Sequence, residues 1–358
     1  MRMPPLVADP QLVTAEWLTA VLRHGAAIDE ASRVVALEPT AIGTGQVGAN
    51  IRYVLAYDGP PGPPTVVCKF SSRDPQSAAT GVQTLTYETE VAFYRDLADR
   101  VDISRPRCYL AAIEPGTANV VVVMDDLAPA EQGDQIAGCT VEQATLAIDE
   151  AAKLHGPLWG HPALRELAWL DRSSSSGGLA GVFPGVWEAF VARYRSTLDD
   201  VTIDAGGRLV ASIDRLRAYE PAALTAIHYD YRLDNMLFGT PAGGRPLTVV
   251  DWQTVQLGLG PMDVAYFLGN AFEADTRRSC EVELLERYHR ALVDDYGITG
   301  YSLEQCWGDY RRSSFASLVM ATFASMMVGR TDRGDAMFMA MANRSAAMAV
   351  DLDTLALL

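Results

Sequence analysis

The sequence predicts an α+β protein of two lobes: a small strand-rich N-terminal lobe with one prominent helix, and a larger, mainly helical C-terminal lobe. Runs of β-branched and aromatic residues dominate up to residue 124, whereas apolar residues recur at helical spacing through most of 140–354. Between these regions, apolar character stops abruptly in DDLAPAEQGDQ (125–135). We therefore expect an N-terminal lobe at residues 1–126 and a C-terminal lobe at residues 127–358.

Composition limits the kind of protein and the kind of partner. The chain has 358 residues, of which 49% are hydrophobic, so burying a core presents no difficulty. A net charge of −16 argues against a nucleic-acid partner, which requires a basic face, and fits a neutral or cationic small molecule. The five cysteines lack the spacing of a zinc site, no apolar stretch is long enough to cross a membrane, and the N-terminus does not resemble a signal peptide. We expect a cytoplasmic protein that contacts no membrane.

The N-terminal lobe is predicted to contain a short first helix, five strands and a second, longer helix. The first helix, at residues 11–24, is amphipathic. The turn DGPPGPP joins the second and third strands and indicates a hairpin. The second helix, at 82–97, has an apolar stripe that includes Val82, Leu85 and Phe93. The strands are expected at 34–39, 51–57, 65–70, 107–113 and 119–124.

The C-terminal lobe is predicted to be helical except around residues 227–251. Apolar periodicity and breaker residues delimit its helices. They are expected at 140–158, 185–199, 207–219, 262–273, 279–296, 303–327 and 332–354.

The most informative segment runs from Ile227 to Asp251 and sets His228, Asp230, Asn235 and Asp251 at the ends of two short apolar strands. Phosphoryl transfer requires one carboxylate to orient an attacking hydroxyl and further oxygen ligands to hold magnesium. Asp230 suits the first role, and Asn235 and Asp251 suit the second. His228 is either a chemical participant or a brace for the loop, and we favour the brace. The alternative for Asn235 and Asp251 is loop capping and exposure at a strand end.

Lys69 lies in the apolar strand TVVCKF, in a chain whose other basic residues, apart from Lys153, are all arginine. A lysine offers a compact, mobile charge that can follow phosphate oxygens. We expect Glu90, which borders the apolar stripe of helix 82–97, to pair with Lys69, and Glu88 is the alternative. The simpler interpretation is a lysine that reaches water and a solvated helical glutamate.

Two backbone segments could also meet a nucleotide. Gly43, Gly45 and Gly48 lie between two strands and no helix follows them, which separates them from dinucleotide-binding motifs. Such a turn can cover phosphates, although glycine-rich hairpin turns are common. Where the lobes meet, the backbone of Met124, Asp125 and Leu127 could pair with an adenine edge, or the segment could be an ordinary acidic connector.

These residues together resemble a known family. HYDYRLDN (228–235) is similar to the HGDxxxxN catalytic loop of the aminoglycoside phosphotransferase and choline kinase-like enzymes, especially their ecdysteroid kinase-like branch, which are relatives of protein kinases. VVDWQ (249–253) resembles their counterpart of the protein-kinase DFG motif, and EVAFYRDL (90–97) and KLHGPLW (153–159) also resemble that branch. The chain departs from the pattern at Tyr229, where the family has glycine and a left-handed backbone would be strained.

The resemblance implies a bilobal protein-kinase-like fold that binds ATP and Mg²⁺ and phosphorylates a hydroxyl of a small molecule. Lys69 would grip the phosphates, Glu90 would pair with it, and Asp230 would be the catalytic aspartate. Asn235 and Asp251 would bind magnesium. Two other functions remain open: a catalytically silent nucleotide-binding or regulatory protein, and a metal-dependent hydrolase that uses Asp230, Asp251 and His228. The sequence indicates neither the acceptor nor the oligomeric state.

Overall fold

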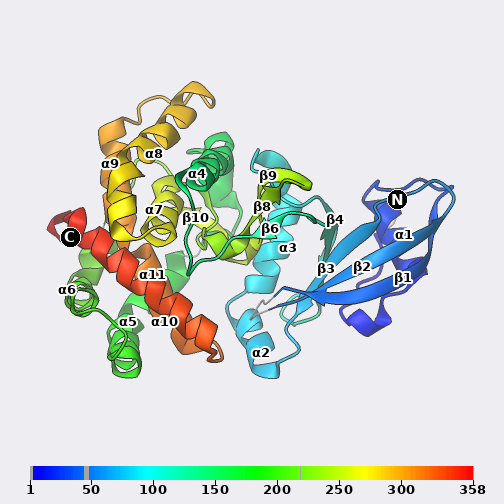
Figure 1. Ribbon diagram of the computed structural model, residues 1–358, viewed down its shortest axis with the longest axis horizontal. Coiled ribbons are helices and arrows are strands. Elements are labelled where there is room, and N and C mark those ends of the chain that lie inside the picture. Colours follow the sequence, from blue (N-terminus) through cyan, green and yellow to red (C-terminus); the bar gives the residue numbers. More distant parts are fainter. Residues whose placement is uncertain (1–2, 44–47, 172, 218, 358) are drawn as a thin grey trace. The chain divides into compact units, whose positions relative to one another are not determined.

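The computed structural model describes residues 3–43, 48–171, 173–217 and 219–357, and the chain forms two compact units. The first unit consists of Met1–Asp99, Arg105–Ala128 and Asp251–Gln253. The second consists of Arg100–Ser104, Pro129–Val250 and Thr254–Leu358. Figure 1 shows the helices and strands of both units and labels most of them.

The first unit is built on a five-stranded antiparallel sheet in the order β1-β2-β3-β5-β4, and all five predicted strands are confirmed. The expected hairpin is also confirmed, because β2 and β3 pair antiparallel with Asn50 opposite Lys69. The strands are β1 (Arg33–Ile42), β2 (Gly48–Asp58), β3 (Thr65–Ser71), β4 (Cys108–Ile113) and β5 (Val120–Asp125).

Alternation along the strands divides this sheet into two apolar faces. Cys68 and Phe70 of β3 pack on one face with α1 (Ala15–His24), which lies beside β1 in Figure 1. Val67 of β3 packs on the other face with Tyr87 and Val91 of α3 (Thr86–Asp96). Because Lys69 is two residues from Val67, its side chain is on the face that α3 covers.

The helix expected at 82–97 is confirmed as α3, but α3 begins only at Thr86, and residues 82–83 belong to a separate helix, α2 (Pro75–Gln83). The chain breaks at Leu85, which adopts a left-handed backbone with φ of 58° and is half exposed. A Cβ atom at Gly81 would lie 2.5 Å from the ring of Tyr87, so the first turn of α3 packs directly on the backbone of α2. The apolar spacing continues across this turn and therefore conceals it.

The second unit is mainly helical, as expected, with two small sheets in the orders β10-β7 and β6-β8-β9. Its helices are α4 (Val141–His155), α5 (Ser173–Tyr194), α6 (Asp200–Arg217), α7 (Gly260–Ala271), α8 (Ala274–Asp294), α9 (Leu303–Arg312), α10 (Ala316–Met327) and α11 (Asp332–Asp351). Its strands are β6 (Glu131–Gln132), β7 (Thr225–Ile227), β8 (Met236–Thr240), β9 (Gly243–Val249) and β10 (Gln256–Gly258). The predicted α+β class is confirmed.

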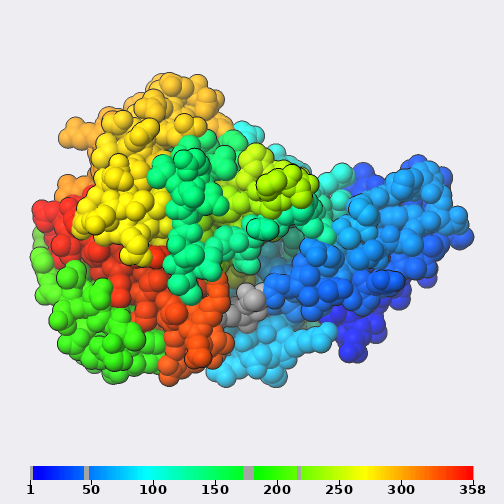
Figure 2. All heavy atoms as spheres, in the orientation of Figure 1, coloured from blue at the N-terminus to red at the C-terminus, as the bar shows by residue number. Residues whose placement is uncertain are grey.

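The helix expected at 303–327 is interrupted at Ser313–Phe315, a short 3-10 turn between α9 and α10. The hydroxyl of Ser313 donates to the carbonyl of Asp309, and the hydroxyls of Ser314 and Thr354 bond to each other. Side-chain bonds of this kind compete with the helical pattern. In Figure 2, α11 (red) lies on the visible surface between α7 (yellow) and α6 (green), and the contacts of α11 agree.

Among the helices that the structure describes, none combines the length and the apolar character needed to cross a membrane.

Candidate functional site

Lys69 is held between two carboxylates within the first unit. Its ammonium Nζ lies 2.9 Å from Glu90 Oε1 and 2.6 Å from Asp251 Oδ1. The Lys69 side chain is 13% exposed and that of Glu90 is 5% exposed, so the pair is largely removed from water. Strand β3, helix α3 and the segment Asp251–Gln253 therefore each contribute one charged group to a single cluster.

The charges of this cluster depend on one another. Burial lowers the pKa of Lys69, but Asp251 and Glu90 outweigh it, and the resulting pKa lies above the ordinary value. Burial raises the pKa of Glu90, and the positive charge of Lys69 lowers it by a smaller amount, so the pKa of Glu90 lies above its ordinary value. The lysine therefore stays protonated, as a ligand for phosphate oxygens must be.

Asp251 is positioned by the residue that follows it. Trp252 stacks on Phe93 of α3, with ring centroids 4.0 Å apart and planes 5° from parallel. The backbone N–H of Trp252 also donates to the Glu90 carboxylate. Asp251 itself has a φ of 70°. Residues other than glycine rarely adopt this backbone conformation, and where they do, the position often has a functional role.

The partner of Lys69 is Glu90 and not Glu88. Successive residues of a helix are turned by about 100°, so residues two apart face different directions. Glu90 faces the sheet and is buried, whereas Glu88 accepts the backbone N–H of Gly116 at 2.7 Å.

The glycine segment is described only at its two ends. Gly43 has a φ of 76°, and a Cβ at Gly48 would lie 3.1 Å from the carbonyl of Phe70 and 3.3 Å from Cε of Lys69. Gly48 therefore adjoins the Lys69 side chain, while Gly45 lies outside the described residues. Covering a nucleotide remains a prediction for all three glycines.

Some groups of the segment proposed to contact adenine are already bonded or packed within the sheet. The N–H of Asp125 donates to the carbonyl of Arg107, and the Asp125 carboxylate accepts the N–H of Arg107 at 2.7 Å. Met124 is buried with the apolar residues of the α3 face. The N–H of Asp125 is therefore taken, and a base contact by Met124, Asp125 or Leu127 remains a prediction.

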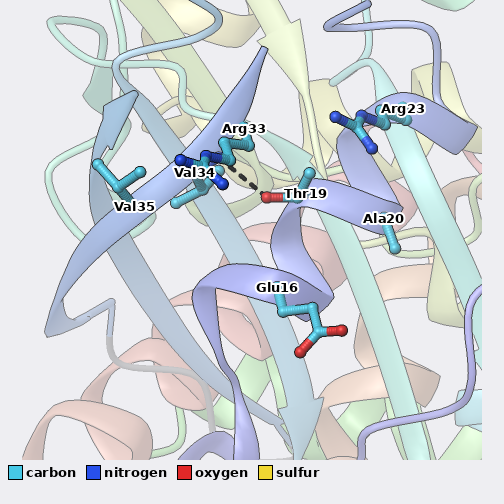
Figure 3. A pocket seen from close by; sticks show the side chains of 7 residues that line it. All are labelled: Glu16, Thr19, Ala20, Arg23, Arg33, Val34 and Val35. Atoms are coloured by element: carbon cyan, nitrogen blue, oxygen red, sulfur yellow. Dashed lines mark hydrogen bonds between the residues drawn. The ribbon is translucent and has the colours of Figure 1, made fainter. Parts of the chain in front are cut away.

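A surface hollow in the first unit, lined by α1 and β1, offers no comparable chemistry (Figure 3). Arg23 donates to the carbonyls of Glu30 and Ser32, and the hydroxyl of Thr19 accepts the N–H of Val34. Arg33 pairs with Asp58. These polar groups are used within the fold, and α1 covers the sheet face opposite to Lys69.

In the second unit, the carboxylate of Asp230 accepts hydrogen bonds from three side chains. Arg232 Nε lies 2.9 Å from Oδ1 and 3.1 Å from Oδ2. The hydroxyl of Tyr266 in α7 donates to Oδ1 at 2.8 Å, and Asn235 Nδ2 donates to Oδ2 at 2.9 Å. The carboxylate is thereby fixed in one orientation.

These donors also set the charge of Asp230. Burial raises its pKa, but the guanidinium of Arg232 and the other donors outweigh burial and hold the pKa below its ordinary value. An ionised, oriented carboxylate suits the receipt of a hydroxyl proton late in phosphoryl transfer. Sequence reasoning did not assign Arg232 or Tyr266 to the site. Arg232 could have been suspected from its spacing, whereas nothing local marks Tyr266.

The loop that carries Asp230 is braced from both sides. Asp263 of α7 accepts the N–H of His228 through Oδ2 at 2.7 Å and that of Tyr229 through Oδ1 at 2.9 Å. His228 Nε2 lies 3.0 Å from the carbonyl of Val250, and its own carbonyl accepts the hydroxyl of Thr254. These contacts support the bracing role of His228. Tyr229 adopts the left-handed backbone, with φ of 69°.

A buried chain of polar groups continues behind Asp263. His155 Nε2 lies 3.1 Å from Asp263 Oδ2, and its Nδ1 lies 2.8 Å from the hydroxyl of Tyr288. His155 is fully buried and belongs to the support of the loop.

Asn235 is oriented by the same loop. Its Nδ2 donates to the carbonyl of Asp230 at 2.8 Å and also to Asp230 Oδ2. These bonds fix the amide nitrogen, so the amide oxygen is the atom of Asn235 that could bind a cation. Magnesium prefers such neutral and anionic oxygens. Asn235 belongs to the second unit and Asp251 to the first, and their action on one ion remains a prediction.

Comparison with known proteins agrees with this chemistry. The model of a family described as the phosphotransferase enzyme family matches residues 53–301. No curated protein matches the chain.

Solved structures share the fold over nearly the whole chain. A choline kinase from Cryptosporidium parvum Iowa II aligns with a TM-score of 0.58 at 11% identity, covering 95% of each chain. The microcompartment-associated aminopropanol kinase aligns with a TM-score of 0.51 at 15% identity, covering 95% of this chain and 99% of that one. A protein from Ralstonia eutropha JMP134 assigned as an aminoglycoside phosphotransferase has a TM-score of 0.50 at 17% identity, covering 93% and 97%. The kinase-like fold implied by the resemblance is confirmed.

Proposed function

Because the chain belongs to the phosphotransferase enzyme family, we propose that it is an ATP- and Mg²⁺-dependent kinase that phosphorylates a hydroxyl of a small molecule. The observation that carries the proposal is the cluster of Lys69, Glu90 and Asp251. Little covalent chemistry is required in phosphoryl transfer, and most of the catalysis comes from positioned charges.

The cluster provides a cation for the phosphates of a nucleoside triphosphate and a carboxylate for its magnesium ion. Lys69 supplies a buried cation for phosphate oxygens, and Glu90 keeps that cation on the α3 face of the sheet. Asp251, which is paired with Lys69 in the structure, would hold magnesium together with the amide oxygen of Asn235. Magnesium bound there would neutralise charge on the phosphates. Lys69 would then exchange Asp251 for a phosphate oxygen.

Asp230 would act on the acceptor. An acceptor hydroxyl that donates to its carboxylate is oriented toward the phosphorus and loses its proton as the new P–O bond forms. Arg232 and Tyr266 keep the carboxylate ionised and oriented until that point. The same site would serve a small molecule with one accessible hydroxyl, whose identity a screen must supply.

The test is Asp230→Asn, assayed with amino sugars, simple sugars, amino alcohols and hydroxysteroids for acceptor-dependent ADP release. The variant should bind Mg-ATP nearly as tightly as the wild type, while turnover falls by about 10²–10³-fold, or roughly 3–4 kcal/mol. Calorimetric titration with ATP, with and without magnesium, measures the binding.

Two results would contradict the proposal. ATP binding without acceptor-dependent ADP release by the wild type would indicate a silent nucleotide-binding protein. Free phosphate as the sole product would indicate a hydrolase.

A further inference from the structure

The catalytic loop presents three side chains toward solvent. In the segment HYDYRLDN, Tyr229, Asp230 and Arg232 are partly exposed, and the other five residues are buried. Asp230 and Arg232 are already bonded to each other. Tyr229 is therefore the partly exposed aromatic residue of this segment, and it directly precedes Asp230.

The backbone at Tyr229 is strained, and a hydrogen bond to Asp263 holds it in that conformation. Its φ of 69° is a conformation that glycine adopts freely and that a residue with a Cβ adopts at a cost. The Asp263 carboxylate fixes this conformation by accepting the N–H of Tyr229. Strained positions that persist cluster at functional sites, so a tyrosine here suggests a role for its side chain.

Tyr229 directly precedes Asp230, whose carboxylate accepts the hydroxyl of Tyr266. Burial raises the pKa of the Tyr266 hydroxyl, Asp230 raises it further, and the phenol of Tyr229 adds a smaller contribution. The two tyrosines and the catalytic carboxylate therefore share one neighbourhood of the second unit.

We propose that Tyr229 contacts the phosphate acceptor and determines which acceptors react. The inference rests on the proposed kinase function. An acceptor hydroxyl must come within about 3 Å of the Asp230 carboxylate. Tyr229 is the residue before Asp230 and is partly exposed, so a bound acceptor would lie against its phenol.

The chemistry of this face indicates the class of acceptor. A tyrosine ring buries apolar surface and can still bond through its hydroxyl. Arg232 bonds to both Asp230 and Asp234, and Arg333 also pairs with Asp234, so the charges around the carboxylate are balanced within the fold. The favoured acceptor carries an apolar or C–H-rich surface beside its hydroxyl.

Substitutions at Tyr229 test the inference. ADP release is measured for the wild type, Tyr229→Ala and Tyr229→Phe with a hydroxysteroid, a methyl glycoside, choline and kanamycin as acceptors. Tyr229→Ala should raise the KM of the best acceptor at least tenfold and narrow the differences in kcat/KM across the panel. The KM for Mg-ATP should stay within twofold, and Tyr229→Phe should retain most of the preference.

Tyr231→Phe is the matched control, because the hydroxyl that it removes belongs to the same loop but is buried and bonds to the carbonyl of Ala147. It should leave acceptor preference unchanged. Should Tyr229→Ala fold poorly, Tyr229→Gly removes the ring and relieves the strained backbone, and it should unfold at a higher urea concentration than Tyr229→Ala.

The possible failures are distinguishable. A wild type that phosphorylates no acceptor overturns the proposed function and this inference with it. An active wild type whose acceptor KM values are unchanged in Tyr229→Ala and Tyr229→Gly overturns the inference alone. An equal loss of affinity for ATP and for every acceptor also overturns it, because that result indicates a structural role.

Discussion

Oδ1 of Asp263 lies 2.9 Å from the backbone nitrogen of Tyr229, and this contact holds a strained residue next to Asp230, the proposed catalytic carboxylate. The other oxygen of Asp263 accepts the N–H of His228. Both N–H groups belong to the loop that carries Asp230, and Asp263 is completely buried. One carboxylate on α7 therefore fixes the direction in which the loop presents Asp230.

Asp263→Asn should destabilise the protein and slow turnover together. The amide can accept only one of the two backbone N–H groups and places an NH₂ group against the other. An unsatisfied buried donor costs about 1–3 kcal/mol, so we expect a loss of that size in the free energy of unfolding. Urea denaturation measures it. Asp275→Asn is the control, since the Asp275 side chain is 97% exposed, and it should change stability by less than about 0.5 kcal/mol. Equal effects of both substitutions would contradict the role of Asp263.

The chemical parts of the site were predictable where they are close in sequence. Asp230 and Asn235 share one loop, and their side chains bond directly. The contacts of Asp263 and Tyr266 with that loop span more than thirty residues, and only the packing of α7 creates them. The sequence predicted a helix at 262–273, which α7 confirms, but its apolar spacing does not show which groups Asp263 contacts.

The strands of the first unit were predictable because they are runs of β-branched and aromatic residues. Which side of the sheet each residue faces became clear only from the packing of β3 and β5. Helical periodicity was less reliable at boundaries, because the turn at Leu85 and the turn at Ser313–Phe315 preserve the apolar spacing. Both turns depend on contacts with residues that local spacing does not reveal.

Glu90→Gln should weaken nucleotide binding more than Glu88→Gln does. The neutral amide would no longer balance the charge of the buried Lys69, whose remaining carboxylate is the proposed magnesium ligand Asp251. We expect the KM for Mg-ATP to rise about tenfold, which corresponds to roughly 1.4 kcal/mol. Steady-state kinetics at saturating acceptor measures it. Glu88, which bonds to Gly116 on the surface, is the matched control on the same helix. A larger effect of Glu88→Gln than of Glu90→Gln would show that Glu90 is not the functional partner of Lys69.

The ion pair of Asp126 with Arg52 should contribute stability that depends on pH. Their atoms lie 2.7 Å apart. Burial raises the pKa of Asp126, but its bonds with Arg52, with the N–H of Ala128 and with Thr65 outweigh burial and lower the pKa below 3.8. A carboxyl whose pKa is lower in the folded state stabilises the fold above the unfolded-state value. That contribution disappears as the pH falls through the folded-state pKa.

Asp126→Asn should therefore be less stable than the wild type at neutral pH, and the difference should shrink in acid. Urea unfolding at about pH 7, pH 5 and pH 3 should give a constant difference between the first two values and a smaller one at the third. Asp58→Asn is the control, because its pair with Arg33 is exposed. A difference that grows on acidification would contradict the sign of the effect.

Helix α8 carries two arginine–glutamate pairs at a spacing of four residues, and they differ in burial. Arg277 pairs with Glu281 and also contacts Asp351 near the end of α11, and its side chain is 2% exposed. Arg290 pairs with Glu286 at 3.9 Å, and both side chains are largely exposed. The same helix thus contains one buried and one solvent-exposed arginine–glutamate pair.

Arg277→Met should destabilise the protein far more than Arg290→Met. Removing Arg277 leaves the Glu281 carboxylate buried with only the hydroxyl of Tyr310 as a described donor, and breaking a buried pair costs about 3–5 kcal/mol. An exposed pair contributes about 0–1 kcal/mol, so Arg290→Met should scarcely change the unfolding midpoint. Urea denaturation of both variants provides the comparison. The double variant Arg277→Met/Glu281→Leu should recover much of the loss, because the uncompensated charge is then absent. A loss in Arg277→Met no larger than that in Arg290→Met would show that the buried pair contributes no more than the exposed one.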